Sequence, residues 1–325
     1  MRNILVTGSS GFIGFHLSKR LLSSKSNNVI GIDNMNDYYD FKLKKDRLKI
    51  LSKYKNFSFY KSDIQNSVSL KKIFKKHNFN IVINLAAQAG VRNSINDPDT
   101  YFKYNINGFY EILKKCTEFK IEHLVYASSS SVYGPSTKYP FNENLDTSLP
   151  KSFYAATKKV NEVIAHSFSD IYNLKATGMR FFTVYGPYGR PDMSLYKFLN
   201  SIYNNKPIEL FNSGNHFRDF TYIEDCIDGI IILLNRNDKN LKKHEIFNIG
   251  NGNSRPLVKF INEIKKNTSS KKIKIKKLPM QTGDVFKTHS SLKKINKIKK
   301  FKPKYNIETG IKLFIDWYRK YYLVK

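Results

Sequence analysis

A tyrosine and a lysine four residues apart, Tyr154 and Lys158, are the side chains of this sequence best suited to acid–base chemistry. They lie in a segment, 152–172, that predicts a long helix, so both side chains face the same side of it. An ammonium group beside a phenol favours the phenolate and lowers the pKa of the tyrosine. Tyr154 would then act as a general base near neutral pH. This spacing also occurs by chance on many helices. The catalytic interpretation therefore depends on where the pair lies in the fold.

A run of serines stands just upstream, in ASSSSVYG (127–134), at the end of a predicted strand. Active sites of parallel sheets form at the carboxyl ends of the strands. Ser129 can exchange a hydrogen bond with a substrate hydroxyl beside Tyr154, and Ser130 and Ser131 add two hydroxyls nearby.

The segment TGSSGFIG (7–14) follows a predicted strand and opens a predicted helix. Its glycines, Gly8, Gly11 and Gly14, permit a tight turn, a close approach of the backbone to a pyrophosphate, and close helix–strand packing. The N-terminus of the helix then holds the phosphates with free N–H groups and its dipole. Asp33 ends the second predicted strand, where a carboxylate bonds the ribose hydroxyls and repels a 2′-phosphate. NAD is therefore favoured over NADP.

Two further strand ends are expected to complete the cofactor site. Asp63 and Ile64 close the third predicted strand, where the adenine would lie. Leu85, Ala86 and Ala87 close the fourth, and small residues there let the cofactor pass across the strand ends.

Short apolar runs alternate with helical patterns through the first half of the chain. This alternation predicts an α/β fold, a Rossmann-type doubly wound parallel sheet with helices on both faces. We expect an NAD-binding domain over 1–183, with the chain returning to it around 220–250. A smaller C-terminal α/β lobe, mainly 184–325, would bind the substrate.

The net charge of +30 arises from 56 Lys and Arg against 26 Asp and Glu. The excess is mostly lysine, spread over helices and loops. Its densest run, KKIKIKK (271–277), alternates with isoleucine as in a half-exposed strand. A solvated lysine-rich surface is expected rather than a nucleic-acid site, although the charge would attract anionic substrates.

The two cysteines, Cys116 and Cys226, are far apart and isolated. Their placement excludes a disulfide framework and a cysteine-based zinc site, and it fits the reducing cytoplasm. No metal site is predicted. No apolar run approaches the roughly 18 residues that a membrane span needs, so no membrane association is expected.

Six longer segments resemble a known family, and the resemblance covers nearly the whole chain. They are DNMNDYYDFKLKKDRL (33–48), NLAAQAGVRNS (84–94), SFYAATKKVNE (152–162), MRFFTVYGPYGRPDM (179–193), RDFTYIED (218–225) and LPMQTGDV (278–285). The family is the extended short-chain dehydrogenases/reductases, in particular the nucleotide-sugar epimerase/dehydratase group and, within it, the UDP-glucuronate 4-epimerases. The sequence departs from the family pattern at two of these positions. Asn84 stands where His is common, and Thr282 stands where Pro is common.

The resemblance implies a role for each matching residue. Tyr154 is the base, Lys158 its partner and Ser129 the catalytic hydroxyl. The implied NAD contacts are Gly8, Gly11, Phe12, Ile13, Gly14, Asp33, Asn34, Lys42, Asp63, Ile64, Leu85, Ala86, Ala87, Tyr154 and Lys158. The implied substrate contacts are Gln88, Arg92, Ser129, Ser130, Ser131, Thr183, Arg190, Arg218 and Asp284. Arginine suits phosphate and carboxylate because its fork bonds two oxygens at once.

The implied reaction is NAD-dependent 4-epimerisation of a UDP-sugar, UDP-glucuronate to UDP-galacturonate, through a 4-keto intermediate. Tyr154 removes the proton of the 4-hydroxyl while hydride leaves C4. The keto sugar rotates about its link to the diphosphate, and hydride returns to the other face. Because a 4-ketone beside the C5 carboxylate is a β-keto acid that loses CO2, the hydroxyls of the serine run and of Thr183 are expected to hold the carboxylate.

Other readings stay open at this stage. A UDP-glucose or UDP-N-acetylglucosamine 4-epimerase differs only in its sugar pocket, and a UDP-glucuronate decarboxylase shares the fold. A 4,6-dehydratase is discounted, because it would carry Asp-Glu where Ser130 and Ser131 stand. A basic protein that binds NAD and RNA would tolerate loss of Tyr154 or Lys158. The predicted helices at 98–119 and 152–172 resemble those that pair in homodimers of the family.

Overall fold

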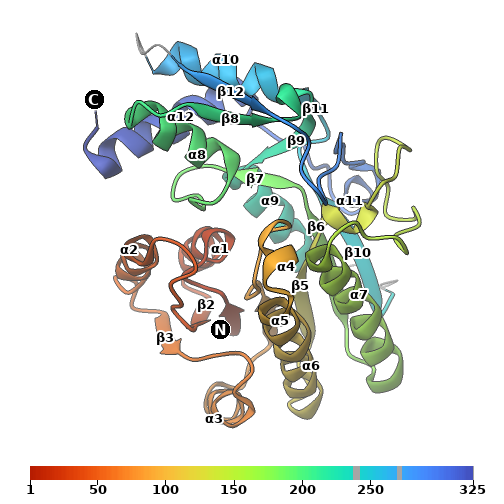
Figure 1. Cartoon of the computed structure of the whole chain (residues 1–325). Coiled ribbons are helices and arrows are strands. Elements are labelled where there is room, and N and C mark those ends of the chain that lie inside the picture. Colours follow the sequence, from red (N-terminus) through yellow and green to blue (C-terminus); the bar gives the residue numbers. More distant parts are fainter. Residues whose placement is uncertain (237–241, 269–272, 325) are drawn as a thin grey trace.

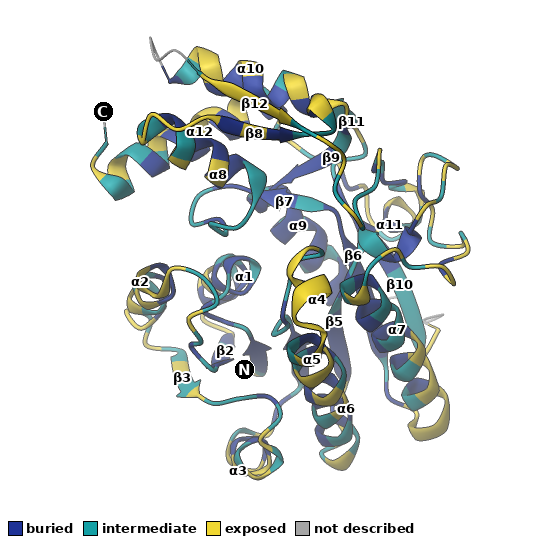
Figure 2. Ribbon diagram, in the orientation of Figure 1, coloured by how far each residue is buried: buried dark blue, intermediate teal, exposed yellow. Residues whose placement is uncertain are grey.

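The main sheet carries seven parallel strands in the order β3-β2-β1-β4-β5-β6-β10. Their bounds are β1 (Arg2–Thr7), β2 (Asn27–Asp33), β3 (Phe57–Lys61), β4 (Ile81–Asn84), β5 (His123–Ser129), β6 (Ala176–Phe181) and β10 (His244–Ile249). The computed structural model describes residues 1–236, 242–268 and 273–324. Figure 2 shows the central strands as buried, which explains their continuous apolar runs. The predicted fold class is confirmed.

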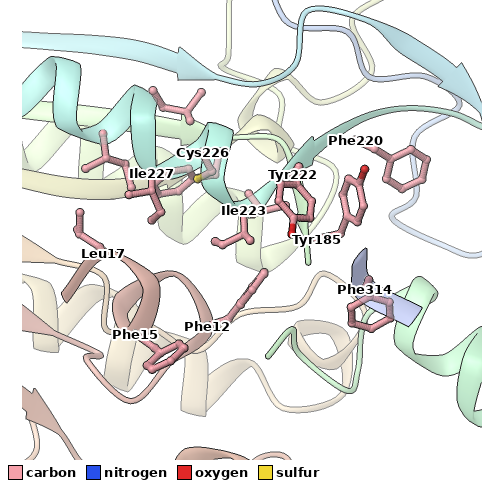
Figure 3. Packing of buried hydrophobic residues seen from close by; sticks show 14 of the residues in the cluster. Phe12, Phe15, Leu17, Tyr185, Phe220, Tyr222, Ile223, Cys226, Ile227 and Phe314 are labelled. Carbon is pink, nitrogen blue, oxygen red and sulfur yellow. The ribbon is translucent and has the colours of Figure 1, made fainter. Parts of the chain in front are cut away.

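Helices cover both faces of this sheet (Figure 1). On one side lie α1 (Phe12–Leu22), α2 (Phe41–Leu51) and α9 (Ile223–Leu234). On the other lie α3 (Ser67–His77), α6 (Gly108–Glu118) and α7 (Phe153–Tyr172). Figure 3 shows Phe12 and Leu17 of α1 packed near Ile223 and Ile227 of α9, in one hydrophobic cluster. The chain thus returns to the sheet through α9 and β10.

The rest of the second half forms two smaller sheets and their helices, in the upper part of Figure 1. One sheet joins β7 (Thr183–Tyr185), β9 (Phe217–Tyr222) and β11 (Ser254–Pro256), and the other pairs β8 (Ile208–Phe211) with β12 (Ile275–Leu278). The helices are α8 (Ser194–Tyr203), α10 (Leu257–Asn267), α11 (Lys293–Asn296) and α12 (Ile307–Tyr322). The basic run predicted as a strand reaches β12, while 271 and 272 lie outside the described residues.

The segment predicted as one helix over 98–119 is divided. It contains α5 (Pro98–Tyr101), a π-helical stretch η1 (Phe102–Asn107) and then α6, and the short α4 (Asn93–Asn96) precedes it. A π-helical turn holds more residues than an α-helical one, and such turns often lie at functional sites.

Within the described residues, no helix is long and apolar enough to cross a bilayer. The same residues contain no group of three His, Cys, Asp or Glu side chains placed to hold a metal ion. Cys116 and Cys226 are both buried and unpaired.

Candidate active site

A cleft of about 410 Å³ lies at the carboxyl ends of the main-sheet strands, between them and the second half of the chain. Ligand sites of α/β sheets form at this edge, where the strand order reverses between β1 and β4. Most of the predicted site residues line it. They are Gly8, Gly11, Phe12, Ile13, Gly14, Asp33, Asn34, Ile64, Leu85, Ala86, Ala87, Gln88, Ser129, Ser130, Ser131, Tyr154, Lys158, Thr183, Arg190, Arg218 and Asp284.

The glycine loop forms one end of the cleft. Gly8 has a φ of +69°, and its amide donates to Ile32 O at 2.7 Å, so the chain turns sharply after β1. A Cβ on Gly14 would lie 2.0 Å from Gly8 O, so α1 begins in direct contact with the loop. No side chain caps the N-terminus of α1, which leaves its first N–H groups for a ligand. This cradle fits the pyrophosphate of a dinucleotide.

Asp33 ends β2 beside this loop and is buried. Its carboxylate accepts from Ser10 N at 3.2 Å and from Met35 N at 2.9 Å, which holds it rigidly in the wall of the cleft. A carboxylate oxygen has two lone pairs, so both oxygens retain capacity for ribose hydroxyls. The negative charge opposes a 2′-phosphate, and the site fits NAD.

Asn34 lines the cleft, whereas Asp63 stands behind it. Asn34 Nδ2 donates to Asp63 Oδ2 at 3.2 Å, and Gln65 N donates to Asp63 Oδ1 at 2.9 Å. Asp63 therefore orients Asn34 and the turn after β3, while its neighbour Ile64 reaches the cleft.

Lys42 does not line the cleft, and its predicted contact with NAD stays a prediction. Its ammonium group, on the exposed side of α2, is 2.6 Å from Asp46 Oδ2. Lys44 lines the cleft instead and donates to Asn36 O at 2.8 Å. Residues two apart on a helix differ by about 200° in direction, so the two lysines point to opposite sides. The apolar residues of α2 mark its buried side, and that signal would have selected Lys44.

Arg92 also does not line the cleft, and its predicted contact with the substrate stays a prediction. Its guanidinium lies over the ring of Phe211, 4.7 Å from the ring centre, and its Nη2 is 3.9 Å from Asp284 Oδ2. Asp284 lines the cleft, so Arg92 stands one residue behind it. Both partners come from distant segments, and no local pattern indicates them.

Tyr154 and Lys158 face the cleft from the first turns of α7. Lys158 is buried, and its Nζ donates to Ala127 O at 3.1 Å. Burial lowers the pKa of Lys158 to about 8. Burial also raises the pKa of Tyr154, while hydrogen bonding with Ser129 and the charge of Arg190 act in the opposite direction. The expected lowering of the Tyr154 pKa is therefore wrong here, because burial outweighs the neighbouring charges.

Four hydroxyl groups gather beside Tyr154. Ser131 donates to Ser129 Oγ through its backbone N–H at 3.2 Å and through its hydroxyl at 2.9 Å. This tight turn keeps Ser129, Ser130 and Ser131 at the cleft, and Thr183 joins them from the start of β7. The serine run and the threonine belong to different halves of the chain.

Two arginines supply positive charge to the cleft. Arg190 donates to Asp192 through Nε at 3.0 Å and through Nη2 at 2.5 Å. Arg218 Nη2 donates to Asp284 Oδ1 at 2.8 Å. The carboxylates fix both guanidinium groups in the wall, where they suit an anionic substrate.

Sequence reasoning missed Asn105, which lies in η1. Its Oδ1 accepts from Gln88 N at 2.7 Å, and its Nδ2 donates to Gln88 O and to Thr157 Oγ1, both at 3.0 Å. Asn105 thus ties the loop after β4 to α7, one residue before Lys158. The π-helical turn directs this side chain inward, and the regular helical pattern carried no signal for it.

The model of the NAD dependent epimerase/dehydratase family matches residues 4–250 of this chain. The chain belongs to this family. It is 44% identical over 333 residues to Protein CapI of Staphylococcus aureus, covering 98% of this chain and 99% of that one. It is 42% identical over 313 residues to the UDP-glucuronate 4-epimerase of Thermodesulfobacterium geofontis, covering 96% and 95%.

A solved structure is similar over the same extent. It is the UDP-glucuronic acid 4-epimerase from Bacillus cereus in complex with UDP-glucuronic acid and NAD, with a TM-score of 0.93 and 30% identity, covering 98% of this chain and 100% of that one. The resemblance seen in the sequence is thereby confirmed. As a member of the NAD dependent epimerase/dehydratase family, the protein uses NAD, which confirms the cofactor prediction.

Proposed function

We propose that this protein interconverts UDP-glucuronate and UDP-galacturonate by NAD-dependent epimerisation at C4. The observation that carries the proposal is the cleft itself, in which Tyr154 and Lys158 lie beside four hydroxyls and two arginines. The names of the similar proteins from Thermodesulfobacterium geofontis and Bacillus cereus support the same reaction and substrate.

Tyr154 takes the proton of the sugar 4-hydroxyl and returns it after epimerisation. Ser129 is placed to orient that hydroxyl, because it lines the cleft with Tyr154 and its Oγ is held by Ser131. Bound NAD supplies a reversible hydride acceptor at sugar C4. The loop of Gly8 and Gly14 would hold its phosphates and Asp33 its ribose, while Arg218 would bind the diphosphate of the substrate.

The C5 carboxylate of the substrate creates a side reaction that this pocket must prevent. A ketone at C4 makes the sugar acid a β-keto acid, which loses CO2 when the breaking C–C bond aligns with the carbonyl π system. We propose that Ser130, Ser131 and Thr183 hold the carboxylate out of that alignment, with Arg190 balancing its charge. Hydroxyls from two halves of the chain can fix the carboxylate plane.

Replacing Thr183 by Ala should lower kcat/KM for UDP-glucuronate about 10–100-fold, since a hydrogen bond to a charged group contributes about 1.5–3 kcal/mol. The share of decarboxylated product should rise. Product separation by chromatography measures both quantities. Thr183→Ser, which keeps the hydroxyl, should behave as the wild type. If Thr183→Ala changes neither affinity nor by-product, the proposed carboxylate site is wrong.

The function itself is tested with purified protein and no added NAD. The protein is incubated separately with UDP-glucuronate, UDP-glucose and UDP-N-acetylglucosamine. Formation of UDP-galacturonate alone supports the proposal. UDP-xylose or a 4-keto pentose would make the protein a decarboxylase, and turnover of only the neutral sugars would make it a neutral-sugar epimerase.

We further propose a homodimer that pairs α6 and α7 with their copies. Exposed apolar side chains gather on these helices, with exposed fractions of 44% for Tyr110, 55% for Val163 and 68% for Ile171. Phe168 joins α6 and α7 through edge-to-face contact with Tyr110, at 6.0 Å between ring centres. An apolar surface of this kind is typical of a protein interface.

The double variant Tyr110→Glu/Val163→Glu should therefore be monomeric, because it places two charges in the interface. Light scattering after size exclusion should change from twice the chain mass to 37.9 kDa. Val258→Glu is the matched control, because Val258 is also exposed but lies on α10. A wild type that already elutes at the single-chain mass would exclude the dimer.

The domain division and the compartment are also proposals. We place the NAD-binding domain at 1–183 with the return over 220–250, and the substrate lobe mainly at 184–325. The two buried, unpaired cysteines support a cytoplasmic location.

A further inference from the structure

A buried ion pair lies beneath the hydroxyl cluster. Arg180 of β6 donates to Glu162 of α7 through Nε and Nη2, both at 2.8 Å, so the pair is bidentate. The exposed fractions of the two side chains are only 3% and 2%. Neither residue lines the cleft. Burying two charges raises the free energy of the folded state unless the two groups are well paired and hydrogen-bonded. This pair therefore fixes the position of β6 relative to α7.

Ser128 adds a third bond to the same carboxylate. Its hydroxyl donates to Glu162 Oε1 at 2.6 Å. Because Ser128 immediately precedes Ser129 in the chain, this bond fixes the end of β5 from which the Ser129 hydroxyl reaches the cleft. Glu162 thus bonds both β5 and β6.

Each partner belongs to a segment that carries part of the site. Glu162 lies four residues after Lys158 and eight after Tyr154, on the same side of α7. Ser128 is the first serine of the run, and Arg180 precedes Thr183 by three residues. In Figure 1 the three elements α7, β5 and β6 lie side by side, and the Cα positions of β5 and β6 pair in register from Leu124 to Ser129.

Neighbouring residues further restrict the positions of the Arg180 and Glu162 side chains. Arg180 Nη1 donates to Glu143 O at 3.3 Å, and the guanidinium lies 4.7 Å from the ring centre of Tyr133. Lys159 Nζ is 3.9 Å from Glu162 Oε2. The Glu162 carboxylate therefore has partners on β5, β6 and α7.

We propose that Glu162, Arg180 and Ser128 act as positioning residues that set the separation between the Tyr154 hydroxyl and the Ser129 hydroxyl. The proposal rests on the epimerisation proposed above. These residues act through Tyr154 and Ser129 and do not contact the reacting atoms. Because a misplacement of about 1 Å can cost on the order of 100-fold in rate, their loss should appear in kcat rather than in KM.

The test compares Glu162→Gln with a matched control, Glu245→Gln. The control breaks another, partly buried pair, between Arg236 and Glu245, and the ion pairs of Glu245 in the described part of the chain do not involve α7. The rate is measured per NAD-containing site, so loss of folded protein does not enter it. We expect kcat of Glu162→Gln to fall about 10–100-fold with KM within about 3-fold, and kcat of Glu245→Gln to remain at the wild-type value. A wild-type kcat in Glu162→Gln, or an equal loss in Glu245→Gln, overturns the proposal.

If Glu162→Gln does not fold, Ser128→Ala tests the positioning proposal. This variant removes one hydrogen bond but keeps the Arg180–Glu162 ion pair. We expect its kcat to fall about 3–10-fold at constant KM, and an unchanged kcat overturns the proposal. If the wild type epimerises none of the UDP-sugars, the proposed function fails. Crystal structures of the wild type and Ser128→Ala then test the positioning alone. A changed separation between the Tyr154 and Ser129 side-chain oxygens supports it, and an unchanged one overturns it.

Discussion

Tyr154→Phe is expected to reduce kcat for UDP-glucuronate epimerisation by about 10²–10⁴-fold, the usual contribution of a general acid–base group. The ring and its packing remain, so bound NAD and the melting temperature should stay close to the wild-type values. The loss arises because the Tyr154 hydroxyl, which lines the cleft with Ser129 and Lys158, is the group that exchanges the proton with the sugar. Steady-state assays together with the NAD content per chain measure the effect.

The matched control is Tyr196→Phe, on α8. The Tyr196 side chain is buried, and its hydroxyl has no hydrogen-bond partner among the described residues, so removal should leave kcat within about 3-fold. If Tyr154→Phe retains more than about a tenth of the wild-type kcat, Tyr154 is not the base.

The pH dependence of the wild type follows from the same residues. The base is the phenolate, and burial raises the pKa of Tyr154, so kcat/KM should rise about tenfold per pH unit from acid pH. The pKa of Lys158 is lowered to about 8, so the rise should level above that pH. The gain in phenolate is then offset by loss of the lysine charge. In Lys158→Met the remaining activity should continue to rise beyond pH 8, and a wild-type profile that is flat from pH 6 to 9 would contradict this assignment.

Gly14→Ala is expected to yield protein with little bound NAD, with the NAD content per chain reduced by at least about tenfold. The added Cβ would lie 2.0 Å from Gly8 O and 3.1 Å from Ser9 Cα, both backbone atoms that cannot rotate away. The loop must shift, and overpacking of this kind also lowers the free energy of unfolding by about 1–3 kcal/mol. Absorbance of released NAD and urea denaturation measure the two effects.

Gly229→Ala, in α9, is the control for this substitution. Its Cβ would meet Ile249 side-chain atoms at 3.2 Å, and a side chain can yield by a few tenths of an ångström. This variant should retain NAD. A Gly14→Ala protein with a full complement of NAD would show that the loop does not bind the cofactor.

Several parts of the site could be predicted because their signals are local. The glycines at 8, 11 and 14, the strand before them and the helix after them stand within one short segment. Tyr154 and Lys158 share one helix, whose period alone places them on one side. The order of strands and helices also decided the fold class, since alternating elements require a parallel sheet.

Other parts of the site could not be predicted, because they depend on which distant segments of the chain pack together. Lys42 was predicted and Lys44 lines the cleft, because the phase of α2 is set by the side that packs against α1. Asn105 was missed because a π-helical turn, which the apolar pattern does not reveal, directs it toward Gln88. The direction of the Tyr154 pKa was wrong because burial is a property of the closed cleft and not of the Tyr154–Lys158 spacing.

The sequence by itself determined the parallel α/β fold, the use of NAD and the presence of the tyrosine–lysine pair, because each follows from residues close together in the chain. Only the tertiary structure decided how Thr183, Arg218 and Asp284 meet the serine run, and that Glu162 and Arg180 form a pair beneath it. Those contacts join residues from separate strands and helices. Their partners are chosen by packing and by the cost of leaving a buried charge unpaired, which no local pattern encodes.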